Sequence, residues 1–465
     1  MMIRNGNVTY SQGGGIMLPG YNQGTEIMGM NPGFNAPGVG FIFGQQTGFG
    51  NGSSDFLDYA QRNEWLVKNT SFNNAYRETT NERLNLKLIV EPVRDFRIEL
   101  STSWDDSRSF TTFNRYYDTL ILEDGSEVFD TYNRDSPILT GNFSTNFWML
   151  PSAFSSDQAN NVNEFFEIFS ENRAVVSRRL GEENRNSTIN EDSVYAEGYN
   201  GSSADVLIPA FIAAYSGQDP EKVNLNPFAK IYIPDIRITY TGLSKIPALK
   251  KLFRSVSLSS AYRSTKVISG YQSNIRFVDD GSGFTDVIDT TSGNFETEFI
   301  YTAVVLREAF SPLLNIDLTL QNSFLVRFEV KYDRTLSLQT QNSTVNEIRG
   351  TEYVVGLGYT FKQVRFPFSS KDNRNALRSD LKVRGDISLR NTLNINRTLD
   401  TQIQPNQATN GSNNLSVRFS ADYKVNRNLN LRFYINHIAN TPVISTAFPT
   451  STTDVGFSVR FNLSG

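Results

Sequence analysis

The chain holds few residues whose type and spacing would suit catalysis or metal binding. His437 is its single histidine, and it lies where a predicted strand meets the segment HIANTPVISTAFP. Acid–base catalysis and metal sites need partner groups close to the imidazole, so a lone histidine here is better interpreted as a hydrogen-bonding or interfacial residue. Cysteine is absent, which excludes thiolate ligands, disulfides and a cysteine nucleophile. We therefore expect no catalytic residue, no metal ligand, no bound cofactor and no enzymatic activity.

Pairs of neighbouring acidic residues are the remaining candidates for general acid–base chemistry. They are Asp105 with Asp106, Glu182 with Glu183, and Asp279 with Asp280. All three pairs lie in or beside polar segments, which favours solvated charge over paired-carboxylate catalysis. The segment DDGSG at 279–283 lacks the later ligands of a calcium loop, and GVGFIFG at 38–44 lacks the spacing of a dinucleotide-binding turn.

The composition limits the class of protein further. The 465 residues are 38% apolar and 20% charged, with a net charge of -4, which is too balanced to predict binding to nucleic acid. The longest nearly apolar run, 206–215, is about half of the roughly 20 residues that a membrane-spanning helix requires. The first residues, MMIRNGNVTYSQGGG, contain no apolar signal-peptide segment, so the chain as written is expected to carry no export signal.

Alternation of apolar and polar residues predicts most of the elements. In LKVRGDISLR (381–390), Leu381 falls on one side and Arg384 and Arg390 fall on the other. The same two-residue period, which is the signature of a strand with two different faces, runs through FLVRFEVKYDR (324–334). The polar face of each of these segments is densely charged with both signs.

The sequence predicts roughly ten to twelve strands. The segments are 83–91, 96–116, 137–149, 231–240, 254–276, 296–320, 324–334, 352–364, 381–390, a hairpin over 415–436, and 454–463. Segment 296–320 could be one bent strand or two, because it contains Pro312. Tight turns are predicted at 91–95 and 424–428, and long polar loops at 118–136, 278–295, 340–351 and 399–413. Short turns alternating with long loops are typical of outer-membrane barrels.

Two regions depart from the strand pattern. Residues 11–56 are rich in Gly, Pro and Asn, which predicts a loop. Residues 157–217 have helical periodicity, and we expect this polar-backed helical segment in the lumen or at a rim, away from lipid. The resulting division is 1–156 (loop and barrel strands), 157–230 (a helical cap, plug or docking element) and 231–465 (barrel strands).

The strands fit either a soluble β-sandwich or a membrane barrel. The predicted strands are much longer than the five or six residues usual in soluble sheets, and their polar faces are strongly charged, so we favour the barrel. The fold class we expect is all-β: an arc of a very large antiparallel transmembrane β-barrel with a small helical insertion. The predicted lumen-facing residues are Arg327, Lys331, Arg384, Arg390 and Arg418, and the predicted lipid-facing residues are Leu381, Phe419, Phe433 and Phe457.

The last predicted strand has a further feature. It follows a pattern of a polar residue, a glycine and two apolar residues that serves as the assembly signal of bacterial outer-membrane barrels. Asp454, Gly456, Val459 and Phe461 occupy these four positions. We expect this strand to be delivered to the barrel-insertion machinery, which pairs with its exposed edge.

Several stretches together resemble one family. They are PGVGFIFGQQ (37–46), DVLIPAFIAAYSGQDP (205–220), RITYTGLSKIPALKKLFRSVSLSSAYRST (237–265), LREAFSPLLNIDLT (306–319) and TEYVVGLGYTFK (351–362). They are similar to the C-terminal region of the SprA/Sov proteins, the outer-membrane translocons of type IX secretion, which are also linked to gliding motility.

The resemblance implies an integral protein of the cell outer membrane whose wide lumen passes folded cargo proteins. Its implied partners are secreted cargo, plug and gate-associated proteins, the barrel-insertion machinery and outer-membrane lipid. Members of this family are several times longer than this chain and carry a signal peptide, so we expect a C-terminal fragment of a longer protein. The alternatives are a diffusion porin, a receptor-type outer-membrane transporter and an outer-membrane enzyme.

Overall fold

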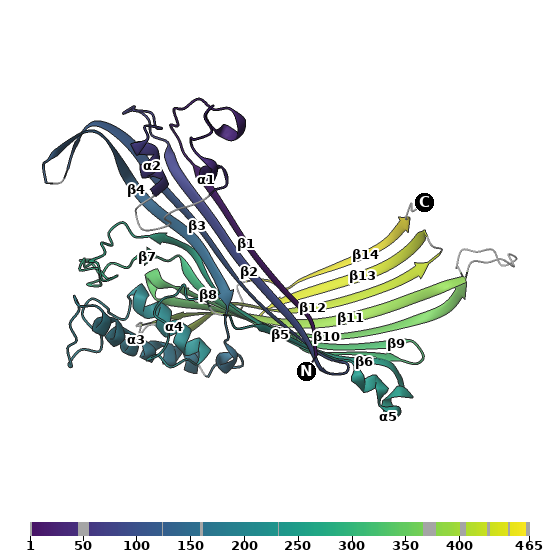
Figure 1. Ribbon diagram of the computed structural model, residues 1–465. Helices are drawn as coiled ribbons and strands as arrows, with labels where there is room; N and C mark the ends of the chain where they lie inside the picture. Colours follow the sequence, from purple (N-terminus) through teal and green to yellow (C-terminus); the bar gives the residue numbers. More distant parts are fainter. Residues whose placement is uncertain are drawn as a thin grey trace.

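The computed structural model describes residues 2–44, 55–122, 124–158, 161–230, 232–365, 378–399, 406–425, 428–444 and 447–461. In this part of the chain, long strands form a single antiparallel sheet (Figure 1). The expected fold class is confirmed: the chain is all-β, with an antiparallel sheet and a small helical insertion. None of the described helices combines the length and the apolar character that crossing a membrane would need.

The main path of the sheet follows the order β1, β2, β3, β4, β6, β8, β9, β10, β11, β12, β13, β14, and β5 and β7 pair off this path. The strands of the first half are β1 (Met2–Met17), β2 (Ala75–Val93), β3 (Phe96–Ile121), β4 (Glu127–Asn146), β5 (Asp235–Tyr240), β6 (Phe253–Ser273) and β7 (Phe299–Ile300). Those of the second half are β8 (Ala303–Leu320), β9 (Phe324–Gln339), β10 (Thr344–Arg365), β11 (Arg378–Thr398), β12 (Asn406–Lys424), β13 (Leu429–Pro442) and β14 (Thr450–Phe461).

The sheet is a curved arc with two free edges. Figure 1 shows β1 to β4 rising on one side and β11 to β14 on the other, so that the sheet encloses a concave space. Within the described residues, β1 pairs only with β2, and β14 pairs only with β13. The arc therefore does not close on itself, and each edge leaves a row of backbone donors and acceptors without a strand partner.

The helical insertion leaves the sheet in the middle of a strand. β3 pairs with β4 from Trp104 onward and with β5 from Phe96 to Ser101, and β6 likewise pairs with both. β4 and β5 thus occupy the same place in the sheet, between β3 and β6, one beyond the other along the strand direction. Residues 147–234 separate them in the chain. Asn146 fills the break, since its side-chain oxygen accepts a 2.7 Å hydrogen bond from the backbone of Ser103. The indole of Trp148 donates to the carbonyl of Pro234 at 3.0 Å and ties the two ends of the insertion together.

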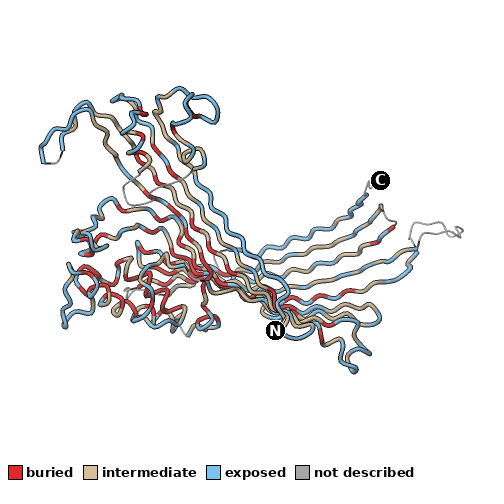
Figure 2. The backbone as a smooth tube through the Cα atoms, viewed as in Figure 1, coloured by how far each residue is buried: buried red, intermediate tan, exposed pale blue. Residues whose placement is uncertain are grey.

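Two helices form the body of the insertion. The longer one, α3 (Glu164–Glu183), begins after Asn163, whose side chain caps it by accepting from the backbone of Phe165. The second, α4 (Ala204–Ser216), is apolar on nearly all sides and is buried between α3 and the sheet. The main hydrophobic core therefore lies between the insertion and the ends of β4, β6, β8, β9 and β10, and Figure 2 shows the buried residues gathered there.

Short helices complete the structure. They are η1 (Ile27–Gly29), α1 (Val39–Ile42), α2 (Asp55–Arg62), η2 (Leu150–Ser152), η4 (Gly242–Lys245), α5 (Pro247–Lys250) and η5 (Thr340–Asn342). A second small core joins α2 to β2, β3 and β4 through Leu57, Tyr76, Phe110 and Leu139.

Several predicted loops prove to be strand. Residues 2–17 form edge strand β1, although a loop was expected from residue 11 onward. β3 and β4 extend through most of 118–136, η5 makes a tight turn where a loop over 340–351 was expected, and β12 begins inside 399–413. Polar, Asn-rich and Gly-rich segments were misjudged because cross-strand pairing overrides their weak strand propensity. The turn at 91–95, the loop within 278–295 and both helical segments are confirmed, and β8 is one strand with an irregular register near Pro312.

Candidate functional site: the two faces of the sheet

The pairing registers assign every strand residue to one of two faces. β9 and β10 pair without a register shift from Phe324 to Gln339, so alternate residues of β9 lie on opposite faces throughout. Phe324, Val326, Phe328 and Val330 share one face, which we call the outward face. Arg327, Glu329 and Lys331 lie on the other, the inward face. The registers from β10 to β14 carry this division to the last strand.

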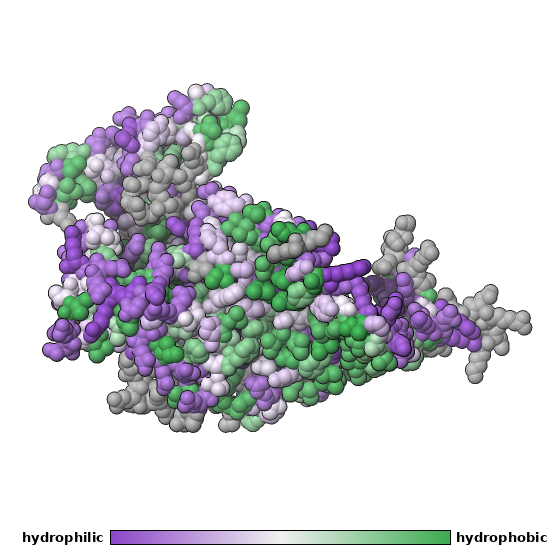
Figure 3. All heavy atoms as spheres, turned by 60° about the horizontal axis from the view of Figure 1, so that its bottom comes forward, coloured by the Kyte–Doolittle hydropathy of each residue, from purple (hydrophilic) through white to green (hydrophobic). Residues whose placement is uncertain are grey.

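An apolar band covers the outward face of β9 to β14. Its residues are Phe328, Tyr353, Val355, Leu357, Phe361, Leu381, Ile387, Leu389, Leu415, Phe419, Phe433, Val455, Phe457, Val459 and Phe461. All of them except Leu381 are exposed, Phe457 to 64%. Figure 3, which brings the underside of Figure 1 forward, shows apolar residues gathered on this convex face. An exposed apolar surface of this extent marks contact with a membrane or with protein.

The band has the height of a lipid bilayer core. In β10 it runs from Tyr353 to Phe361, and in β11 from Leu381 to Leu389. A tilted strand needs about 9 to 11 residues to cross the hydrocarbon layer, and both segments match that length. The strands themselves are longer, up to 26 residues in β3, so each extends beyond the band.

A charged wall lies on the inward face behind the band. Its residues are Asp317, Arg327, Glu329, Lys331, Asp333, Glu352, Arg384, Asp386, Arg390 and Arg418. Ion pairs connect many of them. Arg327 lies 3.0 Å from Glu329, Lys331 lies 3.4 Å from Glu352, and Arg390 lies 2.8 Å from Asp333. The wall is therefore hydrophilic, and its charges compensate one another locally.

The nine residues predicted to face the lumen or the lipid form two groups on opposite faces of the sheet. The cations Arg327, Lys331, Arg384, Arg390 and Arg418 share the inward face. Leu381, Phe419, Phe433 and Phe457 share the outward face. One register row crosses six strands on the inward face and consists of Arg327, Gly356, Asp386, Arg418, Asn436 and Asp454.

Arg384 and Arg418 differ from the other three cations. Neither makes an ion pair within 4.0 Å in the described part of the chain, and both side chains are exposed. Arg384 borders a hollow of about 330 Å³ above Gly356 and Gly358, which have no side chains to fill it. Arg384 and Arg418 are therefore free to contact a molecule in the concave space. Strand periodicity does not distinguish them from the three cations that form ion pairs.

The helical insertion covers the outward face, which corrects the expectation of a lumenal position. Along the outward face of β9, Phe328 is exposed and Tyr332 is half-buried, whereas Arg334, Leu336 and Leu338 are buried. The ring of Phe154, from the insertion, lies 5.3 Å from that of Tyr332. The insertion therefore lies beside the apolar band, on the same face, over the far halves of the strands. The expectation failed because it assumed that lipid contacts the whole length of each strand.

A buried ion network attaches the insertion to the sheet. Arg334 lies 2.8 Å from Glu308 and donates to Ser152 of the insertion at 2.6 Å. Arg397 donates to Asp157 of the insertion at 2.8 Å and also pairs with Glu347. Arg334, Glu308, Glu347 and Arg397 are at most 3% exposed.

Arg349 completes this network, lying 3.3 Å from Glu347 and pairing with Asp157. The network joins three guanidinium groups with three carboxylates. Desolvating any of these charges is costly unless the partners stay in place, so the network fixes where the insertion sits. The sequence analysis did not predict this network. A signal was present, because Arg334 and Arg349 lie at strand positions where the alternation calls for an apolar residue.

The four positions of the predicted assembly signal lie on edge strand β14. Asp454 and Gly456 are on the inward face, and Val459 and Phe461 are on the outward face. Asp454 lies opposite Asn436, Val459 opposite Leu431, and all of β14 pairs with β13 alone. Among the described residues, the second edge of β14 is thus unpaired, which is the arrangement that the predicted assembly signal requires.

His437, Asp105, Asp106 and Asp280, which were candidates for chemistry, have structural partners. His437 lies within β13, not at its end as expected, and its Nδ1 is 2.8 Å from the hydroxyl of Thr453 on β14. Asp105 and Asp106 lie on β3, within the strand predicted over 96–116, and each pairs with an arginine. Asp280 accepts hydrogen bonds from Ser282 and Asn186, and these bonds hold the pKa of its carboxyl well below the usual range.

Comparisons with known proteins add little to this geometry. No family model matches the chain, and no curated protein matches it. Among solved structures, the chain is similar to a loop L8 deletion mutant of OmpT, described as an outer membrane protein of Vibrio cholerae. The alignment has 9% identity and covers 84% of this chain and 99% of that one, with a TM-score of 0.20. At that TM-score the similarity carries no argument about fold or function.

Proposed function

We propose that this chain forms an arc of the wall of a very large outer-membrane β-barrel, a translocon that exports folded proteins by type IX secretion. The observation that carries the proposal is the two-faced sheet, with an apolar band of bilayer height on its convex face and a charged wall on its concave face. In outer-membrane barrels, outward residues are apolar and inward residues are polar.

The mechanism is passage without bond chemistry. A folded cargo protein would slide along the inward face, where compensated charges such as Arg327 with Glu329 present a wet surface without a sticky apolar patch. Arg384 and Arg418, which keep no ion-pair partner in the described residues, would meet the acidic surface of a cargo transiently. The protein would act as a conduit and not as an enzyme.

The unpaired edges support an arc instead of a complete small barrel. In a bilayer core, backbone donors and acceptors must be paired inside the protein. β1 and β14 each have one partner strand in the described residues, so further strands would have to continue the sheet on both sides. The resemblance of the sequence to the SprA/Sov proteins supports the same proposal and adds display of surface adhesins and gliding motility. Cargo, plug and gate-associated proteins, and the insertion machinery would be its partners.

The test is disruption of the chromosomal gene, followed by quantitative proteomics of the culture medium and cell surface. We expect many proteins to be lost from the surface and to accumulate in the periplasm, together with loss of gliding. Complementation with the wild-type gene should restore both, whereas a variant with Leu381→Arg and Phe419→Arg should not. An unchanged set of secreted proteins would refute the proposal. Loss of uptake of one solute would point to a porin or receptor-type transporter, and loss of a hydrolytic activity to an enzyme.

A further inference from the structure

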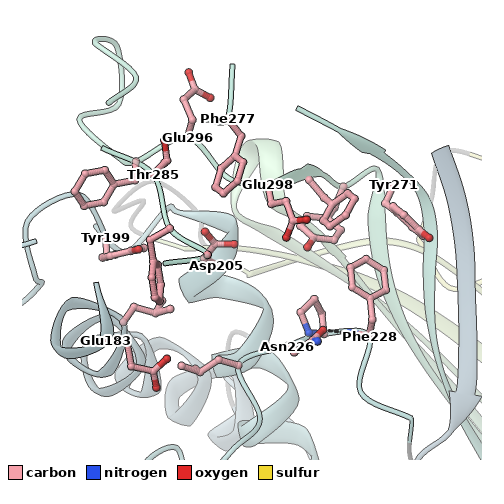
Figure 4. Close-up of a pocket in the computed structure, with 18 of the residues that line it drawn as sticks. Glu183, Tyr199, Asp205, Asn226, Phe228, Tyr271, Phe277, Thr285, Glu296 and Glu298 are labelled. Atoms are coloured by element: carbon pink, nitrogen blue, oxygen red, sulfur yellow. Dashed lines mark hydrogen bonds between the residues drawn. The ribbon is translucent and has the colours of Figure 1, made fainter. Parts of the chain in front are cut away.

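A cavity of about 490 Å³ lies between the insertion and the loop that follows β6. Figure 4 shows that its walls come from separate parts of the chain: α3 and α4 on one side, the segment before β5 on another, and β6 with the 274–298 loop on the third. The loop is fastened to the insertion. Arg185 lies 3.1 Å from Asp280, and the backbone of Asn200 donates to Asn294 at 2.8 Å. The elements that form the walls of this partly open cavity are therefore fastened to one another.

Aromatic rings form much of the cavity wall. Phe228 lies at the centre of this group, with its ring centroid 4.7 Å from Tyr271, 5.4 Å from Phe299 and 6.2 Å from Tyr301. On the opposite side, Tyr199 and Phe295 pack with centroids 5.3 Å apart, and Phe277 and Phe284 also line the space. Ring faces attract cations within about 6 Å of the centroid.

Carboxylates without a cation face the same space. Asp205, in the first turn of α4, and Glu298 make no hydrogen bond or ion pair through their side chains among the described residues. Figure 4 shows both carboxyl groups directed into the cavity. Burial, and to a smaller extent the neighbouring charge of Glu298, raises the pKa of Asp205 to about 7. Partial burial also raises the pKa of the Glu298 carboxyl, although the residue as a whole is exposed.

The other charged groups of the lining supply no countercharge to Asp205 and Glu298. Arg108 is the one basic residue among the described lining residues, and its guanidinium already pairs with Asp106 at 2.6 Å. Glu296 is held by Arg276 at 3.1 Å. The acidic pair is therefore left with no countercharge from the described lining.

A buried tyrosine is a second, independent observation that indicates a ligand. Tyr301 is only 4% exposed, lines the cavity, and makes no side-chain hydrogen bond among the described residues. Both Asp205 and Glu298 act on it electrostatically. A tyrosine hydroxyl that has no protein partner can accept a hydrogen bond from a ligand with polar hydrogens in the cavity.

We propose that this cavity binds an organic cation, a protonated amine or a guanidinium group, between the Asp205 and Glu298 carboxylates and the rings around Phe228. The lining offers what such a group requires: anionic oxygens for its N–H donors and ring faces for its charge. No group of three metal-ligating side chains occurs among the described residues, so the donor set fits an organic cation better than a metal ion. The group could belong to a lysine or arginine side chain of a peptide or to a free amine. This inference does not rest on the proposed function.

The test uses the native full-length gene product, purified in detergent and immobilised for surface plasmon resonance. The probes are acetyl-Gly-Lys-Gly-amide, acetyl-Gly-Arg-Gly-amide, the same lysine peptide with an acetylated side chain, and n-butylamine. We expect the charged probes to bind and the acetylated peptide to bind at least tenfold more weakly. Binding of the peptides without n-butylamine would assign a peptide side chain as the ligand, and binding of n-butylamine alone would assign a free amine.

Variants separate the cavity from general surface charge. Asp205→Asn and Glu298→Gln should each weaken binding of the charged probe at least tenfold, and Phe228→Leu should weaken it severalfold. Asp192→Asn removes one negative charge from an exposed part of the insertion outside the cavity and should leave binding unchanged. Far-UV circular dichroism and the tryptic fragment pattern establish that each variant is folded. Equal binding of the charged and acetylated probes, or equal losses in Asp192→Asn and Asp205→Asn, would overturn the proposal.

Discussion

Arg390 on β11 reaches across strand β10 to Asp333 on β9, with Nη2 2.8 Å from Oδ1. The strand between them carries Gly350 beneath this bridge, and a Cβ there would lie 2.5 Å from Nη2 of Arg390. The absence of a side chain on one strand thus lets the charges of its two neighbours meet. The charged wall depends on such vacant positions as much as on the charges themselves.

Gly350→Val is predicted to break the bridge between Arg390 and Asp333. Because the pair is partly exposed, the loss of stability should be small, about 1 kcal/mol or less, and should shrink as salt is added. Thermal unfolding of the detergent-solubilised protein measures it. In the double variant Arg390→Gln with Asp333→Asn, adding Gly350→Val should have no further effect, and an undiminished effect there would show that the valine acts by another route.

Charged substitutions on the apolar band are predicted to block membrane assembly. Phe419→Arg and Phe433→Arg place a guanidinium on the outward face, at a cost of about 2 to 4 kcal/mol each near the bilayer midplane. The measurement is the amount of heat-modifiable protein in the outer membrane. Ser420→Arg, one residue from Phe419 but on the inward face, is the matched control and should assemble normally. Normal assembly of the first two with failure of the control would mean that the faces are inverted.

Loss of the aromatic ring near the end of β14 is predicted to slow assembly. Phe461→Ser removes an outward residue of the assembly-signal strand, while Arg460→Ser changes its inward neighbour. Pulse-chase labelling of membrane insertion should show a severalfold slower rate for Phe461→Ser and a nearly normal rate for Arg460→Ser. Equal rates for the two variants would remove the support for an assembly signal at this position.

The buried ion network between the insertion and the sheet is predicted to contribute far more to stability than the exposed ion pairs of the charged wall. Arg334→Met leaves Glu308 buried without its guanidinium, which should cost about 3 to 5 kcal/mol. Arg327→Met removes an exposed cation from the same strand and should cost about 1 kcal/mol or less. Limited proteolysis should release the insertion from the first variant only, and similar protection in both would contradict the assigned role of the network.

Asp205 is predicted to make stability depend on pH. Its pKa is raised from 3.8 to about 7 in the folded protein, with Glu298, Tyr199 and Tyr301 nearby, so the folded state holds a proton that the unfolded state has released between those values. Stability from this group is therefore lost as pH rises toward 7. Asp205→Asn should stabilise the protein at pH 8 by roughly 1 to 4 kcal/mol, since one pKa unit corresponds to about 1.4 kcal/mol.

The gain from Asp205→Asn should nearly vanish at pH 3, where the native carboxyl is protonated in the folded state and largely so in the unfolded state. Unfolding midpoints at the two pH values test this. Asp192→Asn, on an exposed part of the insertion, should change neither midpoint. A constant effect of Asp205→Asn at both pH values would show that its carboxyl does not titrate in this range.

Local sequence determined the strands and their two faces. Strict alternation around Leu381 and Arg384, or around Phe419 and Arg418, sets the faces because successive strand residues point to opposite sides of a sheet. The helices near Phe166 and Phe211 were equally visible, since their apolar residues recur at helical spacing or form a continuous apolar run. Edge strand β1 was not visible, because three consecutive glycines carry little strand preference of their own.

Tertiary structure decided which groups meet and what covers them. Arg334 and Tyr332 lie on the same face of β9, but the insertion buries Arg334 fully and Tyr332 only in part. This difference depends on where residues 147–234 leave the sheet, which the strand pattern does not encode. The pairing of Arg390 with Asp333, and the convergence of Asp205 with Glu298 and Tyr301, join residues separated by 57 to 96 positions. The periodicity of a sequence encodes the direction of each side chain, whereas contacts between distant segments arise from register and packing, which no local pattern contains.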